Sequence, residues 1–459
     1  MPDFTEKELE ACLKVLQTIS RNPSIANDLT ELKTLVTKIY TKSRKERRYQ
    51  TKLEKSQEVQ QIKASAFLYQ KNKALESAKN LLPSLNSDDY QTSPKPIKCY
   101  ICKGFYTAVH FFYHSLCPKC AEFNYDKRFQ TADLSGRKAL ITGGRLKIGY
   151  QTALRMLRDG AEVIVTTRFP RNAVNKFAEE KDFSDWQNRL KIFGLDLRNI
   201  IAVEQFAENL LQTEPFLDII IHNAAQTIKR PIGFYQHLLT LENNAQNQLP
   251  QDLANIVKSQ NFQLAEKNEN YPNIFVKENL LIAKQDFDGH GQPKDYRSQN
   301  SWTTKLEEVS TLELLETQLV NSIAPFILNG KLKEILLKSP HERKFIVNVS
   351  AMEGQFNRRN KTSFHPHTNM AKAGLNMMTR TSAQDFAKDK IFMNSVDTGW
   401  ITEENPHPKK TRIQDKGFIT PLDEIDGMVR IYDPIAQGLN SADEPFFGHF
   451  LKDYFPSEW

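Results

Sequence analysis

Cysteine is nearly absent from most of this chain. The 459 residues contain five cysteines, of which four lie between Cys99 and Cys120 and the fifth is Cys12. This distribution excludes a disulfide framework and is typical of a reducing compartment. The amino-terminal sequence also lacks the charged and then apolar layout of a signal peptide, so we expect a cytoplasmic location.

Long apolar runs are absent as well. No stretch reaches the roughly 18 apolar residues that a membrane-spanning helix needs, so we expect no membrane span. The formal net charge is +7, a modest excess that a nucleotide-phosphate site, an anionic partner or an ordinary solvated surface would each explain. At about 150 residues per domain, the length predicts two or three domains.

The amino-terminal region, residues 1–92, is predicted to be helical. It has no glycine, and apolar residues recur at helical spacing over Leu9–Leu16 and Leu32–Ile39. We interpret the region as a helical hairpin or short coiled coil. A polar linker with two prolines follows it and prevents the helix from continuing. The basic run Lys42–Arg48 is interpreted as a solvated helix face, with a nucleic-acid or anionic-lipid patch as the alternative.

Residues 93–130 hold a candidate metal site made of two CxxC pairs. The four cysteines are Cys99, Cys102, Cys117 and Cys120. Each pair can hold two thiolates on one tight turn, and two facing turns make a closed tetrahedral site, which predicts structural zinc. His110 and His114 could replace a cysteine, although packing roles are favoured, and a dithiol redox pair is a weaker alternative.

Residues 131–459 are predicted to form an α/β domain. Short apolar strands such as KALITGG, AEVIVTT and FLDIIIHNAA alternate with amphipathic helices. Continuous apolar strands are typical of a sheet that is buried on both faces, so we predict a Rossmann-type, doubly wound parallel sheet. The polar stretch 228–311 is too long for a plain loop and is predicted to be an insertion beside the active site.

The segment Thr142–Gly149 follows the first strand and opens a helix, which predicts a dinucleotide turn. Gly143 permits the tight turn, and Gly149 permits close packing of helix on strand, so that the free amides at the helix start face a pyrophosphate.

The end of the second strand carries arginines where an NAD site places an acid. Arg168 and Arg171 stand there, and Arg145 lies in the glycine turn. Guanidinium groups suit a 2′-phosphate by charge and geometry, so we predict NADP rather than NAD.

At these residues the chain resembles the short-chain dehydrogenase/reductase family, whose turn reads TGxxxGxG. Lys147 stands where the family has its middle glycine, which is similar to the TGxxxRxG of pteridine reductases. The resemblance covers about Leu134 to the end of the chain, apart from the insertion. The cofactor-binding residues that it implies are Thr142, Gly143, Arg145, Lys147, Ile148, Gly149, Arg168, Asp196, Asn223, Ala224, Lys372, Gly399 and Thr402.

The resemblance also implies a catalytic set, of which two members match. The family's helix Asn and its Lys correspond to Asn321 and Lys372, whereas its Ser and Tyr positions fall on Ala351 and Thr368. A threonine hydroxyl is a far poorer acid than a phenol and cannot take the Tyr role.

Other residues could complete the chemistry. Ser350 neighbours the family Ser position, His365 or His367 could supply a proton near neutral pH, and Tyr235 in the insertion could reach the site. The resemblance thus implies an NADP-dependent oxidoreductase for an unknown carbonyl or alcohol substrate, and a homo-oligomer.

The alternative is an inactive NADP-binding sensor or scaffold. In that case the zinc and helical regions bind a protein partner. Nucleic acid is the less favoured partner.

Overall fold

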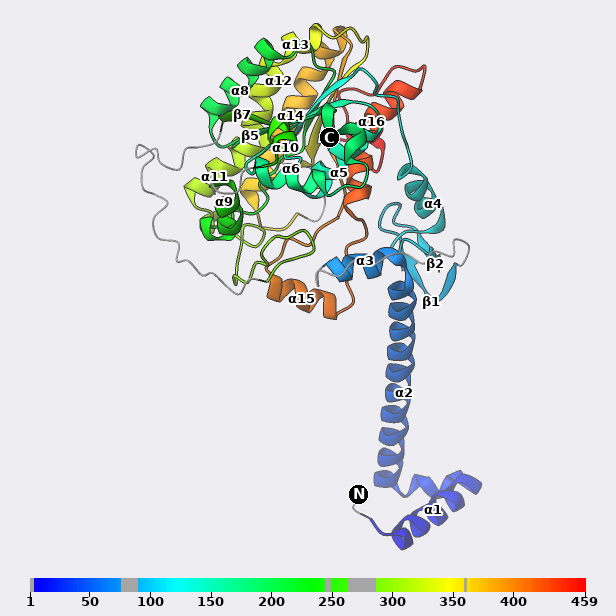
Figure 1. Cartoon of the computed structure of the whole chain (residues 1–459). Helices are drawn as coiled ribbons and strands as arrows, with labels where there is room; N and C mark the ends of the chain where they lie inside the picture. Colours follow the sequence, from blue (N-terminus) through cyan, green and yellow to red (C-terminus); the bar gives the residue numbers. More distant parts are fainter. Residues whose placement is uncertain (1–3, 76–89, 244–248, 263–285, 359–360) are drawn as a thin grey trace.

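The computed structural model describes residues 4–75, 90–243, 249–262, 286–358 and 361–459. It consists of a long helical arm, a small cysteine-containing module and an α/β body (Figure 1). The arm, blue in Figure 1, points away from the body. The domain boundaries inferred from the sequence stay a prediction.

The arm is built from α1 (Glu6–Arg21) and α2 (Thr30–Ser65), followed by α3 (Phe67–Leu75). A capping box formed by Thr5 and Glu8 starts α1. The helix α2 is a single helix of 36 residues in which every residue from 33 to 58 is exposed, so this stretch packs against no second helix among the described residues. No helix in the described ranges, α2 included, is both long enough and apolar enough to cross a membrane.

The module contains β1 (Gln91–Lys98), β2 (Phe105–Val109) and α4 (Pro118–Lys127). The two strands pair antiparallel, with an irregular register between Thr92 and Ile97, where the two prolines lie. The part of the predicted linker that the structure describes, Thr92–Pro96, is thus strand rather than linker. A small apolar core of its own, which includes Leu68 from α3, holds the module together.

The body is a nine-stranded sheet in the order β11-β10-β9-β8-β6-β3-β4-β5-β7. Its strands are β3 (Lys138–Thr142), β4 (Glu162–Thr167), β5 (Leu190–Leu195), β6 (Ile219–His222), β7 (Val257–Phe262), β8 (Lys344–Ser350), β9 (Ile391–Asp397), β10 (Phe450–Lys452) and β11 (Phe455–Ser457). All neighbours are parallel except β10 and β11. The predicted doubly wound α/β fold is confirmed.

Helices cover both faces of the sheet. One face packs against α5 (Lys147–Arg158), α6 (Pro170–Ala178) and α16 (Glu424–Asn440), and the other against α8 (Ile200–Thr213), α12 (Ala324–Lys331) and α14 (Pro366–Lys388). In β3, Ala139 and Ile141 face the first layer and Leu140 the second, because successive side chains alternate across a strand. This explains the continuous apolar runs in the sequence.

The predicted insertion is partly ordered secondary structure. It contains α9 (Gln236–Asn243), α10 (Gln251–Ile256) and β7, which pairs parallel with β5 and extends the sheet. Residues 263–285 lie outside the described residues. The sequence VKSQNF of β7 has little apolar character, so periodicity did not reveal this strand.

A buried ionic cluster joins the arm, the module and the body. Arg128 Nη1 lies 2.8 Å from carboxylate oxygens of both Asp423 and Asp426, and Lys71 Nζ lies 2.7 Å from Asp423. Tyr113 donates its hydroxyl proton to Asp426. Burial opposes ionisation of Asp423, but the nearby cations Arg128 and Lys71 hold its pKa well below the usual range.

Candidate functional site

A cavity of about 1330 Å³ opens at the carboxyl ends of the parallel strands. Residues that follow β3, β4, β5, β6, β8 and β9 line it. The strand order reverses between β3 and β6, and ligands of doubly wound sheets bind outside such a switch point. We refer to this cavity as the strand-end pocket.

The glycine turn on the floor of the strand-end pocket is tightly packed. Gly143 has φ +72°, and a Cβ there would lie 2.8 Å from Ala224 Cα. A Cβ on Gly149 would lie 2.3 Å from Asn223 Nδ2. That amide donates to the carbonyl oxygens of Thr142 and Gly143 at 3.2 and 3.1 Å. The structure therefore brings these predicted residues together, and Ile148 lines the pocket beside them.

Lys147 begins α5 in a left-handed conformation, with φ +51°. It lines the strand-end pocket at the position where the family has glycine. A left-handed residue with a Cβ costs roughly 1–2 kcal/mol, so the turn keeps a glycine-like backbone although the glycine is lost. The sequence shows the substitution but not this conformation.

Two guanidinium groups lie close together at one end of the pocket. Arg145 donates to Asn172 Oδ1 at 2.8 Å and lies over the ring of Phe169, and Arg168 lies 4.4 Å from the ring centroid of Tyr235. Burial and then the charge of Arg168 lower the pKa of Arg145 to about 10. Two guanidinium groups at one end of a pocket favour an anionic ligand. Tyr235 contributes to this cationic end.

Two further predicted residues differ in their relation to the pocket. Asp196 lines it, and its carboxylate pairs with Arg198 at 2.6 Å. Arg171, which the sequence grouped with the phosphate-binding arginines, is outside the lining, and its backbone amide donates to Glu242.

The segment after β9 forms the opposite wall of the pocket. Gly399 has φ +81°, and the hydroxyl of Thr402 donates to Glu404. The amide of Trp400 donates to the hydroxyl of Tyr100 at 2.9 Å. Burial and then the charge of Asp397 raise the pKa of Tyr100 to about 12. Sequence reasoning missed Tyr100 because it belongs to the cysteine segment, far away in the chain.

The family's catalytic positions lie on the pocket wall. Lys372, Thr368 and Ala351 all line it. Lys372 Nζ donates to Val349 O at 2.8 Å, and burial lowers the pKa of this lysine to about 8. Ser350 also lines the pocket, but its hydroxyl donates to Asn376 Oδ1 at 2.6 Å.

The two candidate histidines differ in whether they line the pocket. His365 lines the pocket, with its ring stacked on Trp302 at a centroid distance of 4.0 Å. His367 is outside the lining, and its Nε2 lies 3.4 Å from Glu313 Oε1. His365 precedes α14 in a left-handed conformation, with φ +45°, whereas His367 lies in the first turn of the helix, so the two rings point in different directions. The structure thus does not bring His367 into the pocket.

Asn321 lies behind the pocket in a short π-helical segment, Leu319–Ile323. Its Nδ2 donates to Thr317 O at 2.8 Å and to Gln226 O at 3.1 Å, while its buried Oδ1 has no hydrogen-bond partner among the described residues. Single π-turns are frequent at functional sites, and an open buried acceptor is suited to an ordered water.

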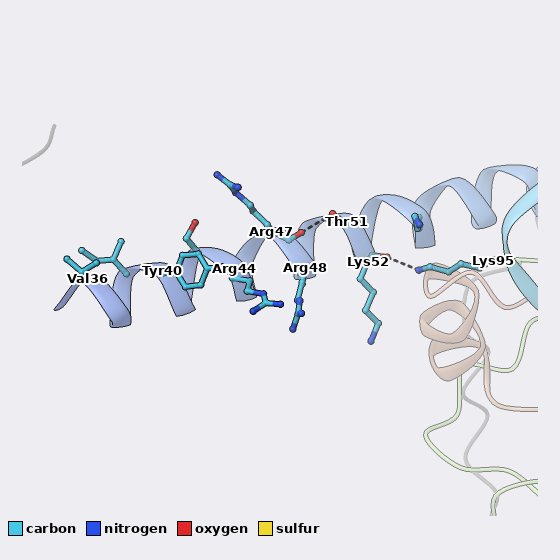
Figure 2. A pocket seen from close by; sticks show the side chains of 11 residues that line it. Val36, Tyr40, Arg44, Arg47, Arg48, Thr51, Lys52 and Lys95 are labelled. Atoms are coloured by element: carbon cyan, nitrogen blue, oxygen red, sulfur yellow. Dashed lines mark hydrogen bonds between the residues drawn. The ribbon is translucent and has the colours of Figure 1, made fainter. Parts of the chain in front are cut away.

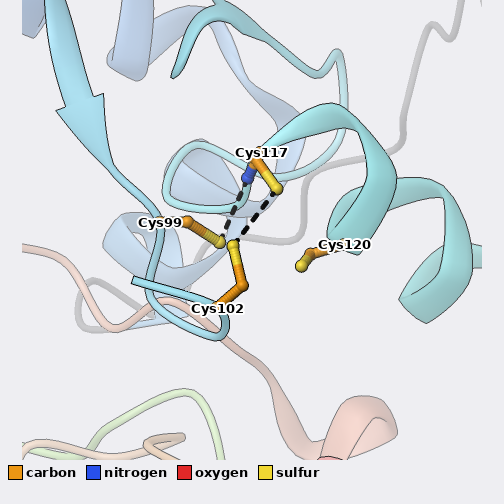
Figure 3. Close-up of side chains that lie close together, drawn as sticks. All are labelled: Cys99, Cys102, Cys117 and Cys120. Atoms are coloured by element: carbon orange, nitrogen blue, oxygen red, sulfur yellow. Dashed lines mark hydrogen bonds between the residues drawn. The ribbon is translucent and has the colours of Figure 1, made fainter. Parts of the chain in front are cut away.

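The four cysteines converge, as Figure 3 shows. Their Sγ atoms all lie within 4.8 Å of one another, and the sulfurs of Cys102 and Cys117 are 3.7 Å apart. Tetrahedral zinc–thiolate bonds of about 2.3 Å place sulfurs about 3.8 Å apart, so the cluster could hold a metal ion. His110 and His114 serve packing: His110 Nδ1 accepts from Phe112 N, and His114 hydrogen-bonds Ile419 O.

A second hollow follows the exposed face of α2 (Figure 2). Six cations and no carboxylate line it. The cations are Arg44, Arg47, Arg48, Lys52, Lys55 and Lys95. The basic run is therefore a solvent-exposed helix face. It lies on the arm, away from the strand-end pocket.

Known proteins match different parts of the chain. The short chain dehydrogenase family matches residues 137–239. An uncharacterized protein from Acanthamoeba polyphaga mimivirus is 32% identical over 357 residues, which cover 75% of this chain and 72% of that protein. A dehydrogenase/reductase SDR family member 13 from Bos taurus is 39% identical over 93 residues, which cover 20% of this chain and 24% of the relative.

The solved structure of an NADPH-bound carbonyl reductase from chicken fatty liver is 16% identical and covers 71% of this chain and all of that chain, with a TM-score of 0.44. The chain spans about a quarter of the Bos taurus relative, 24% of its length. Residues 137–239 are therefore similar to the short chain dehydrogenase family, and the mimivirus protein is similar to this chain over most of its length.

Proposed function

We propose that the chain is an NADP-dependent oxidoreductase that acts on a carbonyl or alcohol substrate. The single observation that carries the choice of cofactor is the pair of guanidiniums, Arg145 and Arg168, beside the glycine turn. A 2′-phosphate would relieve their mutual repulsion and accept their hydrogen bonds, whereas a ribose hydroxyl of NAD would not. The glycine turn would hold the pyrophosphate, and NADPH would supply the hydride.

Nucleotide titration tests the cofactor. We expect NADPH to bind more tightly than NADH, as followed by nicotinamide fluorescence. Arg168→Ala should weaken NADPH binding about tenfold or more and leave NADH binding unchanged, since a charge-assisted pair contributes roughly 1.5–3 kcal/mol. Arg171→Ala is the matched control, because that side chain is outside the pocket lining. Equal losses in both variants, or equal binding of both nucleotides, would contradict the assignment.

The pocket's own residues divide the remaining tasks. Lys372 would contact the nicotinamide ribose, and Asn321 would order a water with its open acceptor. Of the two histidines, His365 would exchange a proton with the substrate oxygen, and its position in the pocket lining supports this role. Burial lowers its pKa, so at neutral pH the ring is uncharged, with one nitrogen able to donate and one able to accept.

A substrate screen followed by a histidine pair tests the chemistry. NADPH oxidation is measured against a panel of aldehydes and ketones. His365→Asn should then lower kcat at least a hundredfold with NADPH affinity unchanged, because general acid–base catalysis contributes about 10²–10⁴. His367→Asn should retain activity. The reverse result would assign the proton to His367.

One observation favours a second candidate, an inactive NADP-binding sensor or scaffold. The hydroxyl of Ser350 is engaged by Asn376, and Thr368 occupies the position of the family's acid. In this case NADPH binds as above but no carbonyl compound in the screen is reduced. Binding without turnover would therefore decide for this candidate.

We also propose that the four cysteines hold a structural zinc ion. All four protein ligands are thiolates, which leaves no open coordination position for a substrate. Elemental analysis should find one zinc per chain, and Cys120→Ser should lower both the zinc content and Tm. A purified protein that contains no metal would contradict the proposal.

A further inference from the structure

The cysteine cluster reaches the strand-end pocket through one side chain. Tyr100 stands between Cys99 and Cys102, and it lines the pocket. Its hydroxyl accepts the amide proton of Trp400 at 2.9 Å, directly after Gly399. The hydroxyl also lies 3.6 Å from the point where a Cβ on Gly399 would stand. A residue of the metal segment is thus part of the wall that forms the nicotinamide side of the pocket.

The loop that carries Tyr100 is held by the cysteines. Cys99 N donates to Gly104 O at 2.8 Å, and Cys117 N donates to Cys99 Sγ at 3.3 Å. Lys103 takes a left-handed conformation with φ +62° to close the turn. Two of the four predicted thiolate ligands therefore flank Tyr100 within one tight turn. A metal ion that binds both would fix this turn.

The rest of the module is anchored independently of this turn. Tyr113 donates to Asp426, His114 hydrogen-bonds Ile419 O at 3.2 Å, and Arg128 pairs with Asp423. These contacts come from residues that follow the Cys99–Gly104 turn in the chain, and none of them uses a cysteine. Loss of the metal should hence loosen the turn while the module stays docked.

We infer that the metal on the four cysteines positions Tyr100, and that Tyr100 in turn holds the segment 397–402 in the conformation that receives the nicotinamide half of the dinucleotide. Metal occupancy would then set cofactor affinity, with Tyr100 as a positioning residue. This inference rests on the proposed function for its ligand. The contact itself is a hydrogen bond between the module and the body.

The test uses two ligands and two variants on the full chain. Tyr100→Phe keeps the ring and removes the hydroxyl, and Tyr106→Phe is the control because its hydroxyl bonds His114 O within the module. NADPH probes the whole pocket, whereas adenosine 2′,5′-bisphosphate probes the arginine end and the glycine turn and lacks the nicotinamide half. We expect Tyr100→Phe to weaken NADPH binding about fivefold, the effect of one net hydrogen bond, and to leave the bisphosphate and the zinc content unchanged.

Removal of the metal completes the cycle. Chelation should weaken NADPH binding to the wild type by a similar factor and add little in Tyr100→Phe, because both act through one contact. Wild-type affinity in Tyr100→Phe, equal losses for both ligands, or additive losses would each overturn the inference. Should the metal-free protein unfold, zinc-loaded Cys102→Ser replaces it, with the same expected loss for NADPH alone.

The proposed function can fail separately. If the wild type binds neither ligand, the nucleotide assignment is wrong, and amide hydrogen exchange then decides on the coupling. The amide of Trp400 should exchange faster in Tyr100→Phe and in metal-depleted protein than in the zinc-loaded wild type. Unchanged protection of this amide would overturn the link between the metal and the segment 397–402.

Discussion

Replacement of Lys147 by glycine should stabilise the protein. Lys147 has φ +51°, in the region where a Cβ meets the neighbouring carbonyl oxygen, at a cost of roughly 1–2 kcal/mol. Glycine avoids this cost but loses more backbone entropy on folding, by about 0.5–1 kcal/mol. The net gain should be about 0.5–1 kcal/mol.

Lys147→Ala is the matched control, because alanine has the same Cβ and, like glycine, lacks the ammonium group. Both variants lose the attraction between Lys147 and Glu404, so their difference isolates the backbone. The unfolding entropy is roughly 2.1 cal/mol/K per residue, which over roughly 300 residues of the body gives about 0.6 kcal/mol/K. Lys147→Gly should therefore melt about 1–2 °C above Lys147→Ala.

The assay is thermal unfolding of the two variants side by side, with NADPH titration of each. Affinity for NADPH should fall by a similar factor in both, because the ammonium near the pyrophosphate site is lost in both. A Tm for Lys147→Gly equal to or below that of Lys147→Ala would refute the argument from backbone strain. Weaker NADPH binding in the glycine variant alone would refute the argument from charge.

Two other substitutions and one pH profile follow from the packing. Gly149→Ala should abolish NADPH binding or lower Tm strongly, because its Cβ would lie 2.3 Å from Asn223 Nδ2, whereas Gly330→Ala, with open space around it, should change neither. Arg128→Met should cost about 3–5 kcal/mol of stability by leaving the buried Asp423 and Asp426 without their guanidinium partner, and a loss below 1 kcal/mol by chemical denaturation would contradict this. Because the folded pKa of Asp423 is lowered from an unfolded value of about 3.9, its contribution is present above about pH 4 and declines on acidification. The Tm of the wild type should therefore fall below pH 4, and that of Arg128→Met should fall less steeply.

The sequence predicts those parts of the fold that local patterns determine. The alternation of apolar strands and helices gives the parallel sheet, and the CxxC pairs give the cysteine cluster. Sequence patterns do not predict β7, because its pairing with β5 depends on tertiary contacts rather than on apolar alternation. The left-handed backbone at Lys147 is not predicted either, because lysine has no preference for that conformation.

In the site, motifs with a fixed spacing predict the glycine turn and Lys372 well. The sequence cannot rank His365 and His367, because it does not show that His365 takes a left-handed conformation just before α14 while His367 lies inside the helix. Nor can it find Tyr100, since nothing in the cysteine segment indicates that its loop packs against residues around Gly399. Contacts between distant segments are the part that patterns leave open.

The straight run of α2 sets a length scale for the molecule. At about 1.5 Å per residue, its 36 residues span about 54 Å. A segment that contacts α1 is therefore attached at one end of this helix, whereas Gln60 near the other end donates to Gly417 O of the α/β body. Binding at α1 would act by fixing where the α/β body is held.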